Sequence, residues 1–167
     1  HQESNRRSGT ENVPAIIGLG KACELAKESL QSYQKRVKGL RDKLEQGIKA
    51  SISNVKINGE KSNRLPNTSN VAFEYVEGEA ILLLLDMVGI AASSGSACTT
   101  GSTEPSHVLQ AMGAPPAQSR GAIRFSLSRY SSDDEIRYIL EKLPPIIKKL
   151  QDLSPVDKQN FLQHAIA

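Results

Sequence analysis

The stretch Gly121–Ser128, GAIRFSLS, alternates strictly between apolar and polar residues. Its apolar positions are Ile123, Phe125 and Leu127, and the arginine at position 124 is the largest of the polar residues between them. Successive side chains of an extended strand point to opposite faces of a sheet. The pattern therefore predicts a half-buried strand with one apolar and one polar face.

Other elements of the same kind lie upstream of this stretch. TSNVAFEYV (residues 68–76) alternates in the same way, NVKING (54–59) predicts a short strand closed by an Asn-Gly turn, and IAA (90–92) a very short one. Residues 13–50 carry apolar residues at helical spacing and predict one long helix or two in succession. Further helices are expected over residues 77–89 and 104–113.

The last predicted helix begins with SSDDE, in which Ser132 and Glu135 have capping-box spacing. We expect Pro144–Pro145 to break this helix before IIKKLQDL resumes it. Helices and strands mixed in this order predict an α+β fold, with a small, mainly antiparallel sheet covered by helices on one face.

Composition excludes several classes of protein. The 167 residues carry a net charge of only +3 and no tryptophan, which argues against a nucleic-acid partner. No apolar run is long enough to cross a membrane. Two cysteines make no disulfide framework, and we expect a reducing, cytoplasmic location. Cys23, in a helical pattern, is expected to be a small core residue.

Cys98 has a different setting, in SSGSACTTGS. Small polar residues and glycines surround it, so this segment cannot bury apolar area. A thiol in such a loop suits a carrier that reacts at one site and delivers to another, since functional residues concentrate on loops. The alternative is a loop cysteine of no consequence.

Two further residues are candidates for binding. Arg124 lies on the polar face of its strand, where a guanidinium fork suits a carboxylate, although a solvated strand arginine is the alternative. Thr10, in RRSGTEN, follows a glycine and two arginines that suit a phosphate, although such turns are common. The three histidines do not cluster with cysteines at the spacing of metal ligands.

Taken together, these pieces resemble the C-terminal part of the PLP-dependent cysteine desulfurases of the NifS/IscS type, within the class V aminotransferases. The resemblance covers almost the whole chain in the family's order, and its most specific motif is SSGSACT followed by EPSHVL. The other matching stretches are RRSGTENVPAIIGLGKA, PNTSNVAF, VEGEAILLLLD, IRFSLSRYSSDDEI and LQDLSP.

The resemblance implies the small C-terminal domain of a fold-type I PLP enzyme plus the long inter-domain helix. Residues 1–12 would then be a remnant of the large PLP-binding domain, residues 13–155 the helix and small domain, and residues 156–167 a polar tail. The resemblance also implies a homodimeric enzyme. Such an enzyme takes sulfur from L-cysteine, releases L-alanine, and passes the sulfur to an iron–sulfur scaffold protein.

The resemblance also implies residue roles. Cys98 matches the cysteine that becomes a persulfide, and by the same match could transiently ligate an iron–sulfur cluster. Arg124 matches the arginine that binds the substrate carboxylate, and Thr10 the threonine that contacts the PLP phosphate of the partner subunit.

One departure from the family limits these expectations. No lysine here matches the family's cofactor-binding lysine, so we expect the chain alone to be inactive. It could be part of a desulfurase, a non-enzymatic persulfide carrier, or a module for dimerisation or other interactions.

Overall fold

The structure, a computed structural model, describes residues 6, 9–61, 63–94 and 106–154. It divides into two compact units, His1–Gln34 and Lys35–Ala167. The elements in chain order are α1 (Val13–Ser51), β1 (Val55–Asn58), β2 (Thr68–Phe73), α2 (Gly78–Asp86), β3 (Ser93–Ser94), α3 (His107–Ala111), α4 (Pro116–Arg120), β4 (Ala122–Ser126) and α5 (Asp133–Leu153).

The four strands form one antiparallel sheet in the order β1-β2-β4-β3. The predicted α+β fold is therefore confirmed. The strand expected at residues 90–92 is wrong in position, because Ile90 instead donates its backbone N–H to Leu85 and closes the end of α2. Pairing with β4 begins only at Ser93. β2 ends at Phe73, and Tyr75, with φ of 66°, has left the extended conformation.

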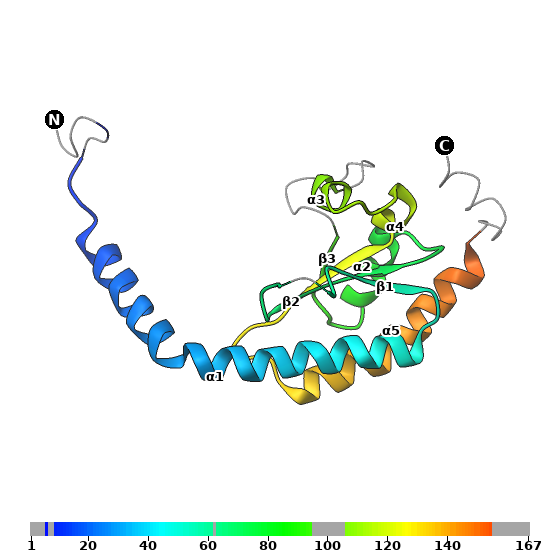
Figure 1. The fold of residues 1–167 in the computed structure, drawn as a ribbon, viewed down its shortest axis with the longest axis horizontal. Coiled ribbons are helices and arrows are strands. Elements are labelled where there is room, and N and C mark those ends of the chain that lie inside the picture. Colours follow the sequence, from blue (N-terminus) through cyan, green and yellow to red (C-terminus); the bar gives the residue numbers. More distant parts are fainter. Residues whose placement is uncertain (1–5, 7–8, 62, 95–105, 155–167) are drawn as a thin grey trace. The chain divides into compact units, whose positions relative to one another are not determined.

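One face of the sheet forms the core. Val71, Phe73, Ile123 and Phe125 are each at most 2% exposed and share this face by alternation. The second half of α1 and α5 lie on one side of the sheet, and α3 and α4 on the other (Figure 1). Two short helices thus add partial cover to the face that we expected to be bare.

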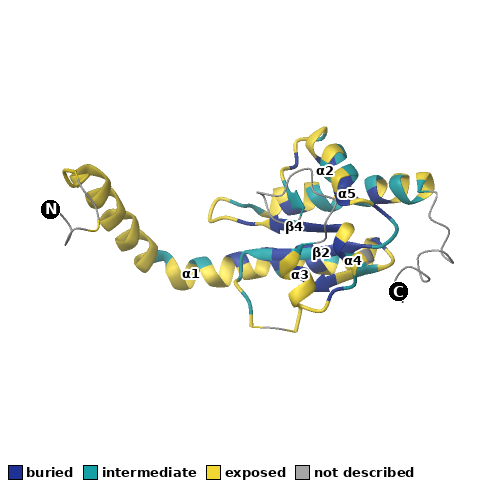
Figure 2. Cartoon of the chain, turned by 90° about the horizontal axis from the view of Figure 1, so that it is seen from above, coloured by how far each residue is buried: buried dark blue, intermediate teal, exposed yellow. Residues whose placement is uncertain are grey.

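α1 is a single continuous helix of 39 residues, which decides between the two arrangements that its sequence allowed. Its buried apolar residues all lie in the second half (Figure 2): Val37, Leu40, Leu44 and Ile48. Their spacing of three to four residues places them on one stripe. Cys23, expected to be a small core residue, is exposed, so this prediction is wrong.

α5 runs through Pro144–Pro145, so the predicted break is wrong. The two prolines remove backbone donors and crowd the preceding turn. Leu143 and Ile147 on either side are both fully buried, and this packing holds the helix together. The predicted capping box is confirmed: Glu135 N–H donates to Ser132 Oγ at 3.2 Å, and Ser132 N–H donates to the Glu135 carboxylate at 2.7 Å.

Candidate functional site

A row of four polar residues crosses the face of the sheet opposite the core. The register pairs Asn58 of β1 with Asn70 of β2, Asn70 with Arg124 of β4, and Arg124 with Ser93 of β3. Residues directly opposite each other in antiparallel strands point to the same face, with Cβ atoms about 5 Å apart. Each strand therefore contributes one polar side chain to a continuous row.

The first pair of the row is fixed by a hydrogen bond. Asn58 Nδ2 donates to Asn70 Oδ1 at 2.7 Å, and Asn58 is only 8% exposed. An amide side chain has one acceptor oxygen and one NH2 donor group. With its oxygen engaged by Asn58, Asn70 keeps its NH2 as the available group.

Arg124 lies between Asn70 and Ser93 in the row and is half-buried. Its Nε is buried and has no hydrogen-bond partner within the described part of the chain. An arginine offers only donors, and a buried donor without an acceptor is costly. No strand residue of this face is acidic, so the sheet itself offers Arg124 no counterion.

An apolar wall borders the row on one side. Ala72, two residues after Asn70, and Ala122, two residues before Arg124, pack with Leu109 of α3 and with Ala114 in a small buried cluster. Lys56 on the same face donates to Gln118 of α4 at 3.1 Å. The short helices thus cover the alanine end of this face, next to Arg124.

The structure does not define the positions of the other two predicted site residues relative to Arg124. Cys98 lies outside the described residues. Thr10 is exposed and belongs to the first unit, next to Gly9, whose φ is 108°. The structure does describe the chain on either side of residues 95–105. Ser94 ends the strand beside β4, and α3, which begins at His107, packs over the polar face.

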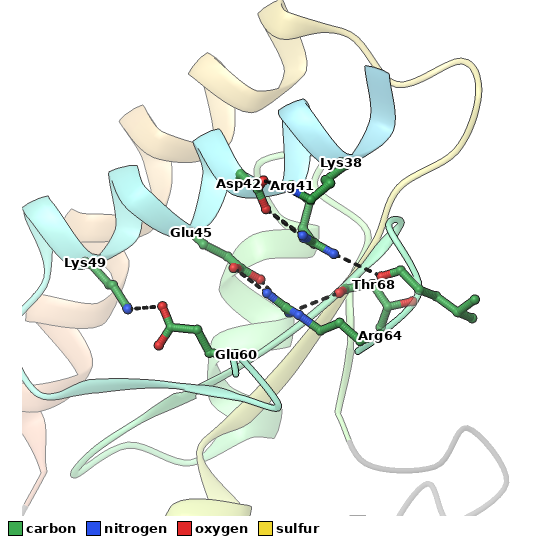
Figure 3. A network of polar contacts seen from close by, with 9 residues as sticks. Lys38, Arg41, Asp42, Glu45, Lys49, Glu60, Arg64 and Thr68 are labelled. Carbon is green, nitrogen blue, oxygen red and sulfur yellow. Dashed lines mark hydrogen bonds and ion pairs between the residues drawn. The ribbon is translucent and has the colours of Figure 1, made fainter. Parts of the chain in front are cut away.

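A second cluster of charged residues lines a cavity of about 390 Å³ between α1 and the β1–β2 connection. Arg64 makes two bonds to the Glu45 carboxylate, at 2.7 and 2.8 Å, and Lys49 pairs with Glu60 (Figure 3). Arg41 bonds Asp42 and the Leu65 carbonyl. Lys38 and Arg41 share Asp42, and the other two cations each have one carboxylate partner. Within the described residues these ion pairs fasten the β1–β2 connection to α1, and we assign the cluster no ligand.

Other sites find no support among the described residues. The described residues contain no group of three or more His, Cys, Asp or Glu that could hold a metal ion. Within the same part of the chain, no helix is long and apolar enough to span a membrane.

Comparison with known proteins identifies the family. The profile of the family described as Aminotransferase class-V matches residues 1–139. The chain belongs to the aminotransferase class-V family. It is 58% identical over 155 residues to a cysteine desulfurase of Gluconacetobacter diazotrophicus, and 56% identical over 155 residues to the cysteine desulfurase NifS of Azotobacter vinelandii. Each alignment covers 93% of this chain and 39% of the relative.

Solved structures agree with this membership in the class-V family. A NifS-like protein superposes with a TM-score of 0.76 at 36% identity, covering 89% of this chain and 37% of that one. A NifS-like protein from Rickettsia africae gives 0.77 at 33% identity, covering 88% and 38%. The predicted resemblance to cysteine desulfurases is confirmed, and this class-V chain spans about two-fifths of the length of its curated relatives.

Sequence reasoning singled out Arg124 but missed its neighbours Asn58, Asn70 and Ser93. The alternation in VKIN and TSNVAF placed each asparagine on a polar face. Only the register between strands shows that the two faces are the same one and that these residues form one row with Arg124.

Proposed function

We propose that this chain is the part of a cysteine desulfurase that binds the substrate carboxylate and carries the sulfur. The supporting observation is Arg124, a half-buried guanidinium whose Nε lacks a partner within the described residues and whose neighbour in β3 leads directly into the Cys98 segment. The relatives named cysteine desulfurase support L-cysteine as the proposed substrate.

In this proposal, the guanidinium of Arg124 binds the carboxylate of L-cysteine with parallel N–H donors. Cys98 is four residues beyond Ser94, and four extended residues span at most about 14 Å. The pairing of Ser93 with Arg124 supports the proposal, because a chain of this length lets Cys98 reach a substrate bound at Arg124. In this proposal Arg124 and Cys98 therefore act on the same molecule of L-cysteine.

The sulfur transfer follows from thiolate chemistry. The Cys98 thiolate attacks the sulfur of L-cysteine, an S–S bond forms, and the Cβ–S bond breaks. The electron pair left on the three-carbon fragment takes up a proton and gives L-alanine, while Cys98 retains a persulfide. The persulfide sulfur then passes to an acceptor, for which we propose an iron–sulfur scaffold protein.

Pyridoxal phosphate supplies the electron sink for such a reaction when bound. Thr10 suits its phosphate, because the residue is exposed and follows Gly9, whose positive φ of 108° is readily adopted only by glycine. We assign this contact to the cofactor of the second subunit of a homodimer. No lysine of this chain is assigned to the aldehyde, and we propose that the chain alone does not turn over L-cysteine.

Persulfide loading tests the role of Cys98. The chain is incubated with a low-molecular-weight persulfide and digested, and its peptides are analysed by mass spectrometry. We expect one added sulfur atom on Cys98, none in Cys98→Ser, and unchanged loading in Cys23→Ser, the matched control. Equal loading of both cysteines, or of neither, overturns the assignment.

A second measurement tests the proposed inactivity. The chain is titrated with pyridoxal phosphate, then given L-cysteine, while visible absorbance and alanine are followed. A cofactor band shifted by protein binding, together with alanine production, would show that the chain is a complete enzyme.

A further inference from the structure

We propose that Asn70 is a second carboxylate-binding residue beside Arg124, and that Asn58 positions it. The ligand class is the carboxylate of a small amino acid. This inference rests on the proposed function for the identity of that amino acid. The carboxylate binding itself needs no sulfur chemistry and can be tested without it.

The first argument is the direction of the Asn58–Asn70 hydrogen bond. Asn58 donates, so Asn70 accepts through Oδ1 and its NH2 is the group left for another partner. Asn70 lies directly opposite Arg124 in the register. Two donor groups, an amide and a guanidinium, are therefore neighbours on this face.

The second argument is the charge of the surroundings. The strand residues that share this face are Lys56, Asn58, Thr68, Asn70, Ala72, Ala122, Arg124, Ser126 and Ser93, and none of them is acidic. Among the described residues, the buried Nε of Arg124 has no hydrogen-bond partner, and adjacent donors with no carboxylate on their face suit a ligand with two acceptor oxygens and a negative charge. A carboxylate has both, and hydrogen bonds to charged groups are about twice as strong as neutral ones.

The third argument concerns size. Ala72 and Ala122, packed against Leu109, form an apolar wall next to the row. A carboxylate bound across Asn70 and Arg124 would have this wall beside it. We infer that the site takes an amino acid with a small side chain.

Asn58 acts through Asn70. It is 8% exposed, and its Nδ2 holds the Asn70 oxygen at 2.7 Å. Without this bond the Asn70 amide would be free to turn its oxygen towards the ligand carboxylate, which would repel it. Asn58 is thus a positioning residue that selects the donor end of Asn70.

The test is an NMR titration of the full, 15N-labelled chain carrying Cys98→Ser, so that sulfur chemistry plays no part. The probe is L-alanine, and ethylamine is the matched compound without a carboxylate. We expect the Arg124 Nε–H and Asn70 Nδ2–H signals to shift with one common Kd for L-alanine and not to respond to ethylamine. This measurement needs no substitution in the site itself.

Variants then separate binding from stability. Asn70→Ala should raise the Kd for L-alanine about 10-fold, as expected for one hydrogen bond to a charged group. Asn58→Ala should raise it less, about 3-fold. Thr68→Ala, on the same strand and face but outside the row, should leave it unchanged. Each variant's unfolding is measured in urea, so that a loss of fold is recognised.

The inference is wrong if the Arg124 signal saturates with L-alanine while the Asn70 signal does not move. It is also wrong if Asn70→Ala folds and binds like Thr68→Ala, or if neither signal responds to a carboxylate. Failure of the proposed function is a separate result, because it appears as absence of sulfur on Cys98 in the chain with that cysteine intact.

Discussion

Both halves of α1 carry apolar residues at helical spacing, but these residues differ in burial. In the first half, Val13, Ile16, Leu19 and Leu30 are 49–66% exposed. In the second half, four residues at helical spacing, Val37 to Ile48, are at most 4% exposed. Apolar periodicity accounts for the helix in both halves. Burial depends on whether another element of the chain packs against the stripe.

The largest expected difference comes from one substitution made in both halves. Leu44→Ala should lower the free energy of unfolding by about 3 kcal/mol, because Leu44 is fully buried and leaves a cavity. Leu25→Ala should change it by less than about 0.5 kcal/mol, because Leu25 is 41% exposed. Urea unfolding followed by circular dichroism measures both.

Equal losses of unfolding free energy in Leu44→Ala and Leu25→Ala would contradict the predicted difference between the two halves of α1. That result would mean that the first half of α1 is covered in solution, for example by a second copy of the chain. Sedimentation of both variants would then reveal the association.

Ion pairs in the two halves of α1 should differ in the same direction, with smaller effects on the free energy of unfolding. Glu45→Gln should cost about 2 kcal/mol, because it leaves Arg64, whose side chain is 18% exposed, without its charged partner. Glu24→Gln, which removes the exposed pair with Lys21, should cost less than about 0.5 kcal/mol. A Glu45→Gln variant as stable as Glu24→Gln would show that the Arg64 pair does not hold the β1–β2 connection.

The smallest effect concerns pH. Burial pushes the pKa of Asp42 up, but hydrogen bonds from Arg41 and Lys38 outweigh it and hold this pKa below its usual value of 3.8. A carboxyl with a lowered pKa stabilises the fold above its ordinary pKa, and this contribution is lost as the pH falls through the lowered value. Wild type should therefore exceed Asp42→Asn in stability at neutral pH, with the gap closing in acid.

Urea unfolding from pH 6 down to pH 3 measures this gap, which should stay below about 1 kcal/mol because Asp42 is one-third exposed. Glu24→Gln serves as the control for removing a negative charge from the first half. A gap that widens in acid would contradict the sign.

Local patterns predicted most of the elements. GAIRFSLS and TSNVAF alternate, and both form strands; SSDDE has capping-box spacing, and the box is present. α4 was missed because its five residues carry no periodic pattern, although Pro116 stands in the first turn, where proline is favoured. Local rules failed at Pro144–Pro145, because the buried side chains of Leu143 and Ile147 outweigh the lost hydrogen bonds.

The candidate site was predicted only in part. Arg124 was identified from its strand, and Cys98 and Thr10 from their loops and from the family resemblance. Cys98 stays a prediction, since it lies outside the described residues, and the structure places Thr10 but does not test its role. The row around Arg124 could not be predicted, because it depends on which residues face each other across strands.

The sequence by itself determined most of the helices and strands, the family and the chemical types of the candidate residues, because short local patterns specify each of these. Tertiary structure alone decided which half of α1 is buried, that a helix with two prolines stays whole, and that Asn58, Asn70 and Arg124 share one row. The physical reason is that burial and strand register depend on residues far apart in the chain, which no local pattern specifies.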